Sequence, residues 1–328
     1  MALACEGEVK TRSIDGDGRH GDDGRGRVPA PMHARRLLPA LLLLAVGCDD
    51  GGRRATPALQ PSLAITAANA VDVAGTAYHT AFEPVRIARI AAAFFEVAPP
   101  TTLPAGPLVV QEVAGPEGGT AVWTWHDRDG DELYSSGDEY TVAFAGYGES
   151  GRVLTGVASF SEVFIDGDVL DGLTWIVTAR LQLLGLQVAI GDDTTTVNGL
   201  LRFAREKRAT VRLLSLQALD DVTVGVRTLH AGSEVARNDY ALDFSMGLFA
   251  TGTLEDPLLG GVLSFRTETP MTGVQVLPDP STGAFAVTGT DGSALTVVPL
   301  DFFTLEIQVD ENGDGEVDVT LPGEWAAL

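Results

Sequence analysis

The chain has very few cysteines. Only Cys5 and Cys48 occur among its 328 residues, so the long part after Cys48 can form no disulfide. That part also offers no thiolate to a zinc ion, which excludes cysteine-based zinc modules. It must therefore be stabilised by packed apolar area, with bound ions as a further possible source of stability.

Basic residues are also scarce. The sequence has 22 lysines and arginines against 45 aspartates and glutamates, a formal net charge of −23 at pH 7. After Cys48 the only lysine is Lys207. So acidic a protein repels phosphate backbones, and no basic stretch interleaved with aromatic residues occurs. We therefore expect no nucleic-acid partner.

Recognisable catalytic motifs are missing. The sequence contains no Gly-x-Ser-x-Gly, no His-Glu-x-x-His and no glycine-rich phosphate loop. The histidines after Cys48, which are His79, His126 and His230, are far apart. His126 precedes Asp127, but it follows an apolar run and we interpret it as a residue at the end of a strand. The sequence therefore leans against an enzyme.

Long apolar runs are missing too. A membrane-spanning helix needs about 20 apolar residues, and the chain has no run of that length. Its most apolar stretch, residues 37–48, follows the basic pair Arg35 and Arg36 and ends in small residues, as secretory signals do. The last four residues, Ala-Val-Gly-Cys, resemble the lipobox of bacterial lipoproteins. The resemblance implies cleavage before Cys48 and a membrane anchor through a lipid on Cys48. The protein would then be located in the cell envelope, at the outer membrane or at the periplasmic face of the inner membrane.

This signal divides the chain into four parts. Residues 1–31 are rich in Gly, Asp and Arg and have no apolar periodicity. Because a signal has to stand at the N-terminus, we interpret them as an over-called extension and Met32 as the start. A disordered arm is the alternative. The signal peptide then covers 32–47, a polar, proline-broken tether covers 48–62, and 63–328 form the folded body.

The body begins with a helical segment at about 64–97. An alanine-rich stretch covers 64–80, and Pro84 suits the first turn of a second helix, which the prolines at 99 and 100 end. We expect a core helix that packs on a sheet and has a thin polar face. The apolar face is predicted from Ile87, Ile90, Ala91 and Phe94, and the polar face from Arg86, Arg89 and Glu96.

The remainder of the body predicts β-structure. Short runs rich in Val, Thr, Phe and Leu alternate with Gly, Asp and Pro turns, and no alternating βαβ pattern occurs. The fold class is therefore mainly β: a large antiparallel meander (curved sheet, open barrel or sandwich) with an N-terminal helical segment. Residues 174–190 also fit a partly helical period. The expected strands cover 107–113, 120–126, 139–146, 153–165, 174–190, 194–205, 209–218, 222–230, 235–245, 248–254, 261–268, 284–290, 294–299, 302–309 and 316–321.

A weak repeat supports strong curvature of this sheet. The pattern Gly-x-x-x-Phe occurs at Gly156, Gly199 and Gly261, each with a phenylalanine four residues on. Positions four apart face the same side of a strand, and glycine permits a tight bend. We expect the three rings to belong to the core rather than to a ligand groove.

The first acidic loop begins at Asp127. Oxygen-bearing side chains occupy positions 1, 3, 5, 9 and 12 from that residue, a spacing that resembles an EF-hand calcium loop. Position 6, normally glycine, is Glu132, and the flanks predict strands rather than helices. The predicted calcium ligands are Asp127, Asp129, Asp131, Ser135 and Asp138.

The second acidic loop begins at Asp310. It has oxygen side chains at positions 1, 3, 5 and 9 and the turn glycine at Gly315, whereas position 12 is Leu321. It resembles the calcium loops of dockerin-like and thrombospondin-like modules. For both loops the alternative is an acidic β-turn without an ion. The predicted ligands are Asp310, Asn312, Asp314, Glu316 and Asp318.

These features predict an exported, lipid-anchored binding or scaffold protein with structural calcium loops. One alternative is a carrier in which an apolar ligand replaces the helix inside the curved sheet; a deep apolar cavity would favour it. The other is a secreted hydrolase that uses scattered carboxylates; an open cleft flanked by exposed tryptophans would favour that one.

Overall fold

A computed structural model gives the fold of the body. The chain divides into two compact units, residues 1–55 and 56–328, and every residue described below belongs to the second. Cys48, the predicted signal peptide and most of the predicted tether lie outside the described residues. The structure describes residues 59–97, 108–128, 130, 135–170, 172–277 and 279–328.

The described body combines one long helix with one antiparallel sheet. The helix α1 spans Ala70–Ala93, and the 3-10 turn η1, Phe94–Glu96, follows it directly. Two further 3-10 turns are η2, Thr290–Gly292, and η3, Trp325–Ala327. The strands are β1 Leu108–Ala114, β2 Thr120–His126, β3 Glu139–Glu149, β4 Arg152–Asp166, β5 Thr174–Ile190, β6 Asp193–Arg208, β7 Val211–Ala218, β8 Val222–Val224, β9 Arg227–Leu229, β10 Glu234–Tyr240, β11 Ser245–Asp256, β12 Gly261–Val274, β13 Thr282–Thr288, β14 Ala294–Pro299, β15 Thr304–Asp310 and β16 Val319–Glu324.

The strands pair almost entirely in chain order. The path runs from β1 to β7 and then from β10 to β16, and the short hairpin β8–β9 bridges β6 and β11. Every pairing is antiparallel, as two-residue turns such as residues 191–192 between β5 and β6 require. The predicted mainly β meander with an N-terminal helix is confirmed. Residues 174–190 are strand throughout, so the partly helical alternative for them is wrong.

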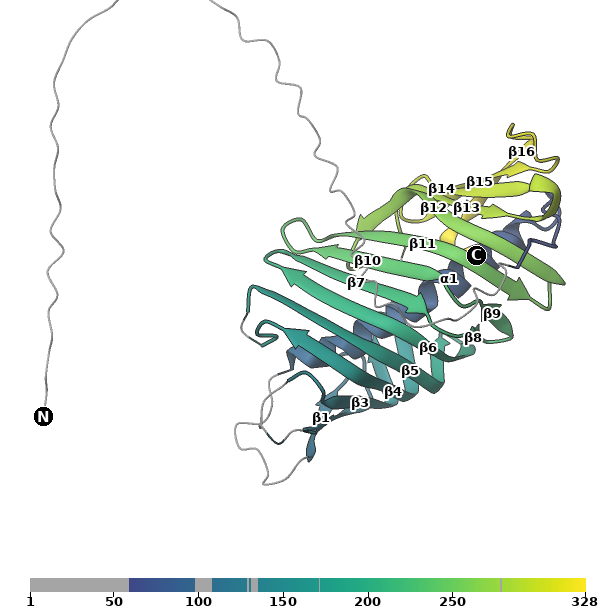
Figure 1. Ribbon diagram of the computed structural model, residues 1–328. Helices are drawn as coiled ribbons and strands as arrows, with labels where there is room; N and C mark the ends of the chain where they lie inside the picture. Colours follow the sequence, from purple (N-terminus) through teal and green to yellow (C-terminus); the bar gives the residue numbers. More distant parts are fainter. Residues whose placement is uncertain (1–58, 98–107, 129, 131–134, 171, 278) are drawn as a thin grey trace, which may run out of the picture. The chain divides into compact units, whose positions relative to one another are not determined.

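The sheet curls around α1, which runs along its concave side (Figure 1). Of the 24 helix residues 19 are buried, and the helix contacts strands as far apart in the sheet as β7 and β15. A helix that is apolar nearly all round is typical of a buried one. Alanines dominate its sequence, which lets strands approach closely from several sides. The concave side of the sheet is thus filled by the protein's own helix.

One sequence prediction about this helix is wrong. Pro84 does not start a second helix but lies inside the continuous α1. Proline there removes the hydrogen bond that the carbonyl of Thr80 would receive and costs about 3 kcal/mol in a helix interior. Packing against the surrounding sheet outweighs that local cost, because Pro84 and its neighbours are almost completely buried.

The Gly-x-x-x-Phe repeat does mark bends, at two of its three positions. Gly156 has φ +129° and lies at a register shift in the pairing of β4 with β5. Gly199 of β6 lies at a register shift in the pairing of β5 with β6. Gly261 instead opens β12, where a side chain would meet Leu63. All three phenylalanine rings are buried, which confirms their place in the core.

Aromatic rings pack around both ends of α1. At the C-terminal end the ring centroid of Phe95 lies 4.9 Å from those of Tyr140 and Phe160. At the N-terminal half, Tyr78 lies 4.8 Å from Trp325. These contacts join the first and last parts of the sheet to one helix, so the helix organises the core of the whole body.

Candidate functional site

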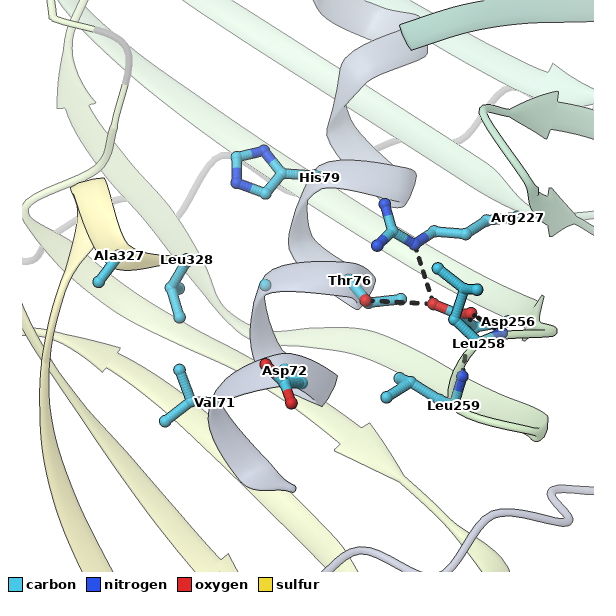
Figure 2. Close-up of a pocket in the computed structure, with 11 residues that line it drawn as sticks. Val71, Asp72, Thr76, His79, Arg227, Asp256, Leu258, Leu259, Ala327 and Leu328 are labelled. Carbon is cyan, nitrogen blue, oxygen red and sulfur yellow. Dashed lines mark hydrogen bonds and ion pairs between the residues drawn. The ribbon is translucent and has the colours of Figure 1, made fainter. Parts of the chain in front are cut away.

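A pocket of about 370 Å³ lies beside the N-terminal half of α1 (Figure 2). The helix forms its floor, the tip of the β11–β12 hairpin one wall, and the last residues of the chain another. Figure 2 shows Thr76, Asp256 and Arg227 joined on one side of the helix, with Ala327 and Leu328 on the other. The lining comprises Val71, Asp72, Gly75, Thr76, His79, Arg227, Asp256, Leu258, Leu259, Ala327 and Leu328.

Asp256 fixes one wall of the pocket. Its carboxylate is completely buried and accepts hydrogen bonds from Arg227 Nε at 2.9 Å and Thr76 Oγ1 at 3.2 Å. The backbone N–H groups of Leu258 and Leu259 also donate to it, at 2.7 and 3.2 Å. Burial raises the pKa of Asp256, but these donors outweigh burial and hold the pKa below its ordinary value. Asp256 is therefore a charged and fully satisfied part of the wall.

His79 is the group in the pocket that is free to bind. Within the described part of the chain neither ring nitrogen makes a hydrogen bond, and the ring meets Tyr78 edge-on at 5.6 Å. Burial, reinforced by the positive charge of Arg86, lowers the pKa of His79 to about 4. The imidazole is therefore neutral at physiological pH and offers one donor and one acceptor.

A buried ionic cluster on the same helix explains part of this shift. The carboxylate of Glu83 accepts a hydrogen bond from Arg152 Nε at 3.0 Å and forms an ion pair with Arg86 Nη1 at 3.5 Å. All three side chains are more than nine-tenths buried. Burial raises the pKa of Glu83, but Arg152 and Arg86 outweigh it and leave the pKa below its ordinary value. A buried carboxylate with two guanidinium partners stays charged, and its partners repel a proton on His79.

The second guanidinium nitrogen of Arg86 extends this cluster to the sheet. It donates to the Tyr78 hydroxyl at 3.0 Å and lies 3.5 Å from Asp279 Oδ1. The Tyr78 hydroxyl in turn donates to Asp279 at 3.4 Å. Burial raises the pKa of both Tyr78 and Asp279, although Arg86 opposes it. The polar side of α1 is thus interior.

The pocket is better suited to binding than to catalysis. A general base or nucleophile pair requires two groups within hydrogen-bond reach, with a third that orients the base. His79 has no such partner among the described residues, and the carboxylate of Asp256 is engaged by four donors. The groups that remain available are the neutral imidazole of His79, the exposed carboxylate of Asp72 and the terminal guanidinium nitrogens of Arg227. The side chains of Val71 and Leu258 add apolar contacts.

The first predicted calcium loop is built around Asp138. This completely buried carboxylate accepts Trp125 Nε1 at 2.8 Å, the backbone N–H of Arg128 at 2.9 Å and that of Ser135 at 3.2 Å. The hydroxyls of Ser135 and Tyr140 donate to it at 3.4 and 3.3 Å. Donors from the protein therefore already surround Asp138, the predicted calcium ligand at position 12.

The other predicted ligands of this loop are only partly visible. Asp127 is buried and accepts the backbone N–H of Gly130 at 2.6 Å. Asp129 and Asp131 lie outside the described residues. His126 ends β2, as its position after an apolar run predicted.

The second loop, at the β15–β16 turn, winds tightly around Asp310. Its two carboxylate oxygens accept the backbone N–H groups of Gly313 and Gly315 at 2.7 and 2.8 Å. The side chain of Asn312 accepts a hydrogen bond from the backbone N–H of Asp314 at 2.8 Å. The side chain of Asp314 accepts one from the backbone N–H of Glu316, also at 2.8 Å. Asp318 accepts the backbone N–H of Glu311 at 2.8 Å and closes the loop. The predicted ligands therefore share one exposed turn.

The described residues contain no acidic cluster with the geometry of a metal site. Within the described residues, no group of three or more His, Cys, Asp or Glu side chains is placed to hold a metal ion. A calcium ion at the second loop would therefore also need Asn312 and backbone carbonyls as ligands, which calcium accepts. No described helix is both long and apolar enough to cross a membrane.

Sequence reasoning missed the pocket and the ionic cluster. Arg86 and Glu96 were predicted on a thin polar face of the helix, but Arg86 is 5% exposed and binds Glu83, and Glu96 binds Arg205 of the sheet. The signal was present in α1, where Glu83 and Arg86 stand three residues apart, a spacing at which side chains of a helix face each other. The partners Arg152, Asp279 and Asp256 carry no sequence signal, because they come from distant strands and loops.

Comparison with known proteins gives no match. No family model, no curated protein and no solved structure is significantly similar to this chain.

The neutral state of His79 predicts a pH dependence of stability. Its pKa is 6.5 in the unfolded chain and about 4 in the folded protein, so between these values the unfolded state binds more protons. The free energy of unfolding should therefore lose about 2–3 kcal/mol as pH falls from 6.5 to 4. His79→Gln should lack this part of the decline in urea titrations, whereas His126→Gln, at the end of β2, should retain it. Parallel curves for wild type and His79→Gln would contradict the assignment.

Proposed function

We propose that this protein is an exported, lipid-anchored protein of the cell envelope that binds a small polar ligand in the pocket beside His79. The observation that carries the binding role is the neutral, mostly buried imidazole whose ring nitrogens have no partner in the described structure. The half-buried imidazole lines the pocket and offers one donor and one acceptor, which a ligand can complete.

The pocket limits the chemistry of the ligand. Its volume of about 370 Å³ suits a small molecule. A hydroxyl group both donates and accepts and so matches a neutral imidazole, while Arg227 and Asp72 offer one further donor and one further acceptor. The apolar sides of Val71 and Leu258 can pack against C–H groups. A hydroxylated compound of about monosaccharide size meets these requirements.

The lipobox-like signal supports the proposed location in the cell envelope. The first described residues connect directly to the body, since the backbone N–H of Ser62 donates to the carbonyl of Val262 at 2.9 Å. The polar segment from residue 48 to this contact then serves as the tether between a lipid on Cys48 and the folded sheet.

Calcium is proposed as a structural ion, chiefly at the second loop. There the carboxylate of Asp310 orders the turn through Gly313 and Gly315, and Asn312 and Asp314 lie on the same turn. A divalent cation would offset the repulsion between the acids of this exposed loop. The first loop, with Asp138 engaged by protein donors, supports an ion less strongly.

The two alternatives receive less support from the fold. A carrier of an apolar ligand needs a deep apolar cavity, whereas α1 and its aromatic contacts fill the concave side of the sheet. A hydrolase of the kind considered needs tryptophans at an open cleft, whereas Trp123, Trp125, Trp175 and Trp325 are all buried.

The binding role predicts a response of His79 to hydroxylated compounds. Glucose or myo-inositol at millimolar concentration should shift the imidazole resonances of His79 in NMR spectra, because a new hydrogen bond changes the ring environment. The resonances of His126 should stay constant and serve as the internal control. His79→Phe should abolish saturable binding, and His126→Phe should leave it unchanged. If neither compound shifts His79, the proposed ligand class is wrong.

The anchor predicts a change in partitioning. Cys48→Ser should move the protein from the detergent phase to the aqueous phase in phase separation and release it from membranes, because it removes the acylated thiol. Thr56→Ser, within the predicted tether, is the control and should leave the protein in the membrane, because it keeps the thiol of Cys48. Unchanged partitioning of Cys48→Ser would show that no lipid is attached there.

The calcium proposal predicts a shift in thermal stability. At a calcium concentration ten times the Kd, binding adds about 1.4 kcal/mol, so the Tm should rise by a few degrees and return with chelator. Asp310→Asn should lose this response. Asp301→Asn should keep it, because Asp301 also accepts two backbone N–H groups in a turn, at 2.7 Å each, but lies outside both loops. An unchanged Tm of the wild-type protein in calcium would contradict the proposed calcium site.

A further inference from the structure

Basic side chains, scarce in this chain, gather on the concave face of the sheet near the C-terminal end of α1. In the register of β6, β7 and β10, Arg205 stands opposite Leu214, and Leu214 opposite Arg237. Burial alternates along each strand, and these three side chains share its buried face. The two arginines are therefore neighbours across one intervening strand, about 10 Å apart at their backbones.

The next row adds more charge to the same face. In the strand register Lys207 of β6 stands opposite Arg212 of β7, and Arg212 stands opposite Asp239 of β10. Glu96 of η1 reaches down to this surface, where it binds Arg205 and accepts Arg212 Nη2 at 2.9 Å. Cations thus outnumber carboxylates here, although the chain as a whole has a net charge of −23.

Three buried N–H donors on this face have no partner in the described part of the chain. They are Arg205 Nη1, Arg237 Nη2 and Trp175 Nε1. The side chains of Arg205 and Arg237 are only 8% and 7% exposed, and the guanidinium of Arg205 lies 5.8 Å from the Trp175 ring centroid. Leaving a charged donor buried and unpaired is costly. All three atoms are donors, so the group that completes them must be an acceptor.

The electrostatics of the two arginines agree with an anion. Burial lowers the pKa of Arg205 to about 10; Glu96 counteracts this shift, while Arg212 and Arg89 add to it. Burial and Arg89 likewise lower the pKa of Arg237, and its partner Asp239, 2.8 Å from Nε, compensates only in part. A further negative charge between these side chains would relieve repulsion among the cations.

We propose that this face is a binding site for an oxyanion, the carboxylate or phosphate group of a ligand, which accepts hydrogen bonds from Arg205 Nη1, Arg237 Nη2 and Trp175 Nε1. Guanidinium forks match both groups geometrically. The site is separate from the pocket at His79 and does not depend on a ligand there.

The experiment uses calorimetric titration of the purified protein at constant ionic strength. The probes are two small anions, inorganic phosphate and acetate, with neutral acetamide as the control ligand. We expect saturable binding of phosphate, of acetate or of both, and the pattern shows whether the anionic group is a phosphate or a carboxylate. Arg205→Gln and Arg237→Gln should each weaken binding about tenfold or more, because each removes a charged hydrogen bond.

Two further variants keep the test decisive. Arg266→Gln is the matched control: it removes the same charge from a side chain that is 70% exposed and bound to Glu268, and it should leave affinity unchanged. Trp175→Phe keeps the ring packing and removes one donor, so it should weaken binding severalfold even if an arginine variant fails to fold. Absence of binding by both anions, equal binding of acetamide, or an equal loss in Arg266→Gln would overturn the site.

Discussion

The structure depends on burying a helix that carries charge. Glu83 of α1 accepts Arg152 of β4 at 3.0 Å, Arg89 reaches Glu149 of β3 at 3.4 Å, and Glu96 of η1 joins Arg205 and Arg212. Removing one partner of a buried pair typically costs 3–5 kcal/mol, because it leaves an uncompensated charge. Apolar packing alone would tolerate sliding of an alanine-rich helix, whereas these pairs define one position of α1 along the sheet and one rotation about its axis.

The same constraint produces both candidate binding regions. Charges taken inside the sheet need partners, and where the pairing is incomplete a polar group remains for a ligand. At the N-terminal half of α1 that group is the neutral imidazole of His79, and near the C-terminal end it is the set of donors on Arg205, Arg237 and Trp175. Thr76 and Arg89 are thirteen residues apart in one helix, which separates the two regions by about 20 Å.

The two acidic loops differ because of burial. Asp138 is completely buried, and hydrogen-bond donors of the protein surround its carboxylate. Asp310 lies on an exposed turn and orders only backbone N–H groups, so a cation can approach it from solvent. The oxygen spacing of the two loops is similar in the sequence, and only their surroundings separate a structural carboxylate from a candidate calcium ligand.

The sequence by itself determined the mainly β class, nearly all strands of the meander, the buried phenylalanines at 160, 203 and 265, and the bends at Gly156 and Gly199. These follow from periodicity and turn residues, which act between close neighbours in the chain. Only the tertiary structure decided that α1 continues through Pro84, that Arg86 points into the core, and that His79 faces a pocket. Each of these depends on groups brought together from distant strands, such as Arg152, Asp256 and Asp279, and their burial reverses what local propensity and residue polarity favour.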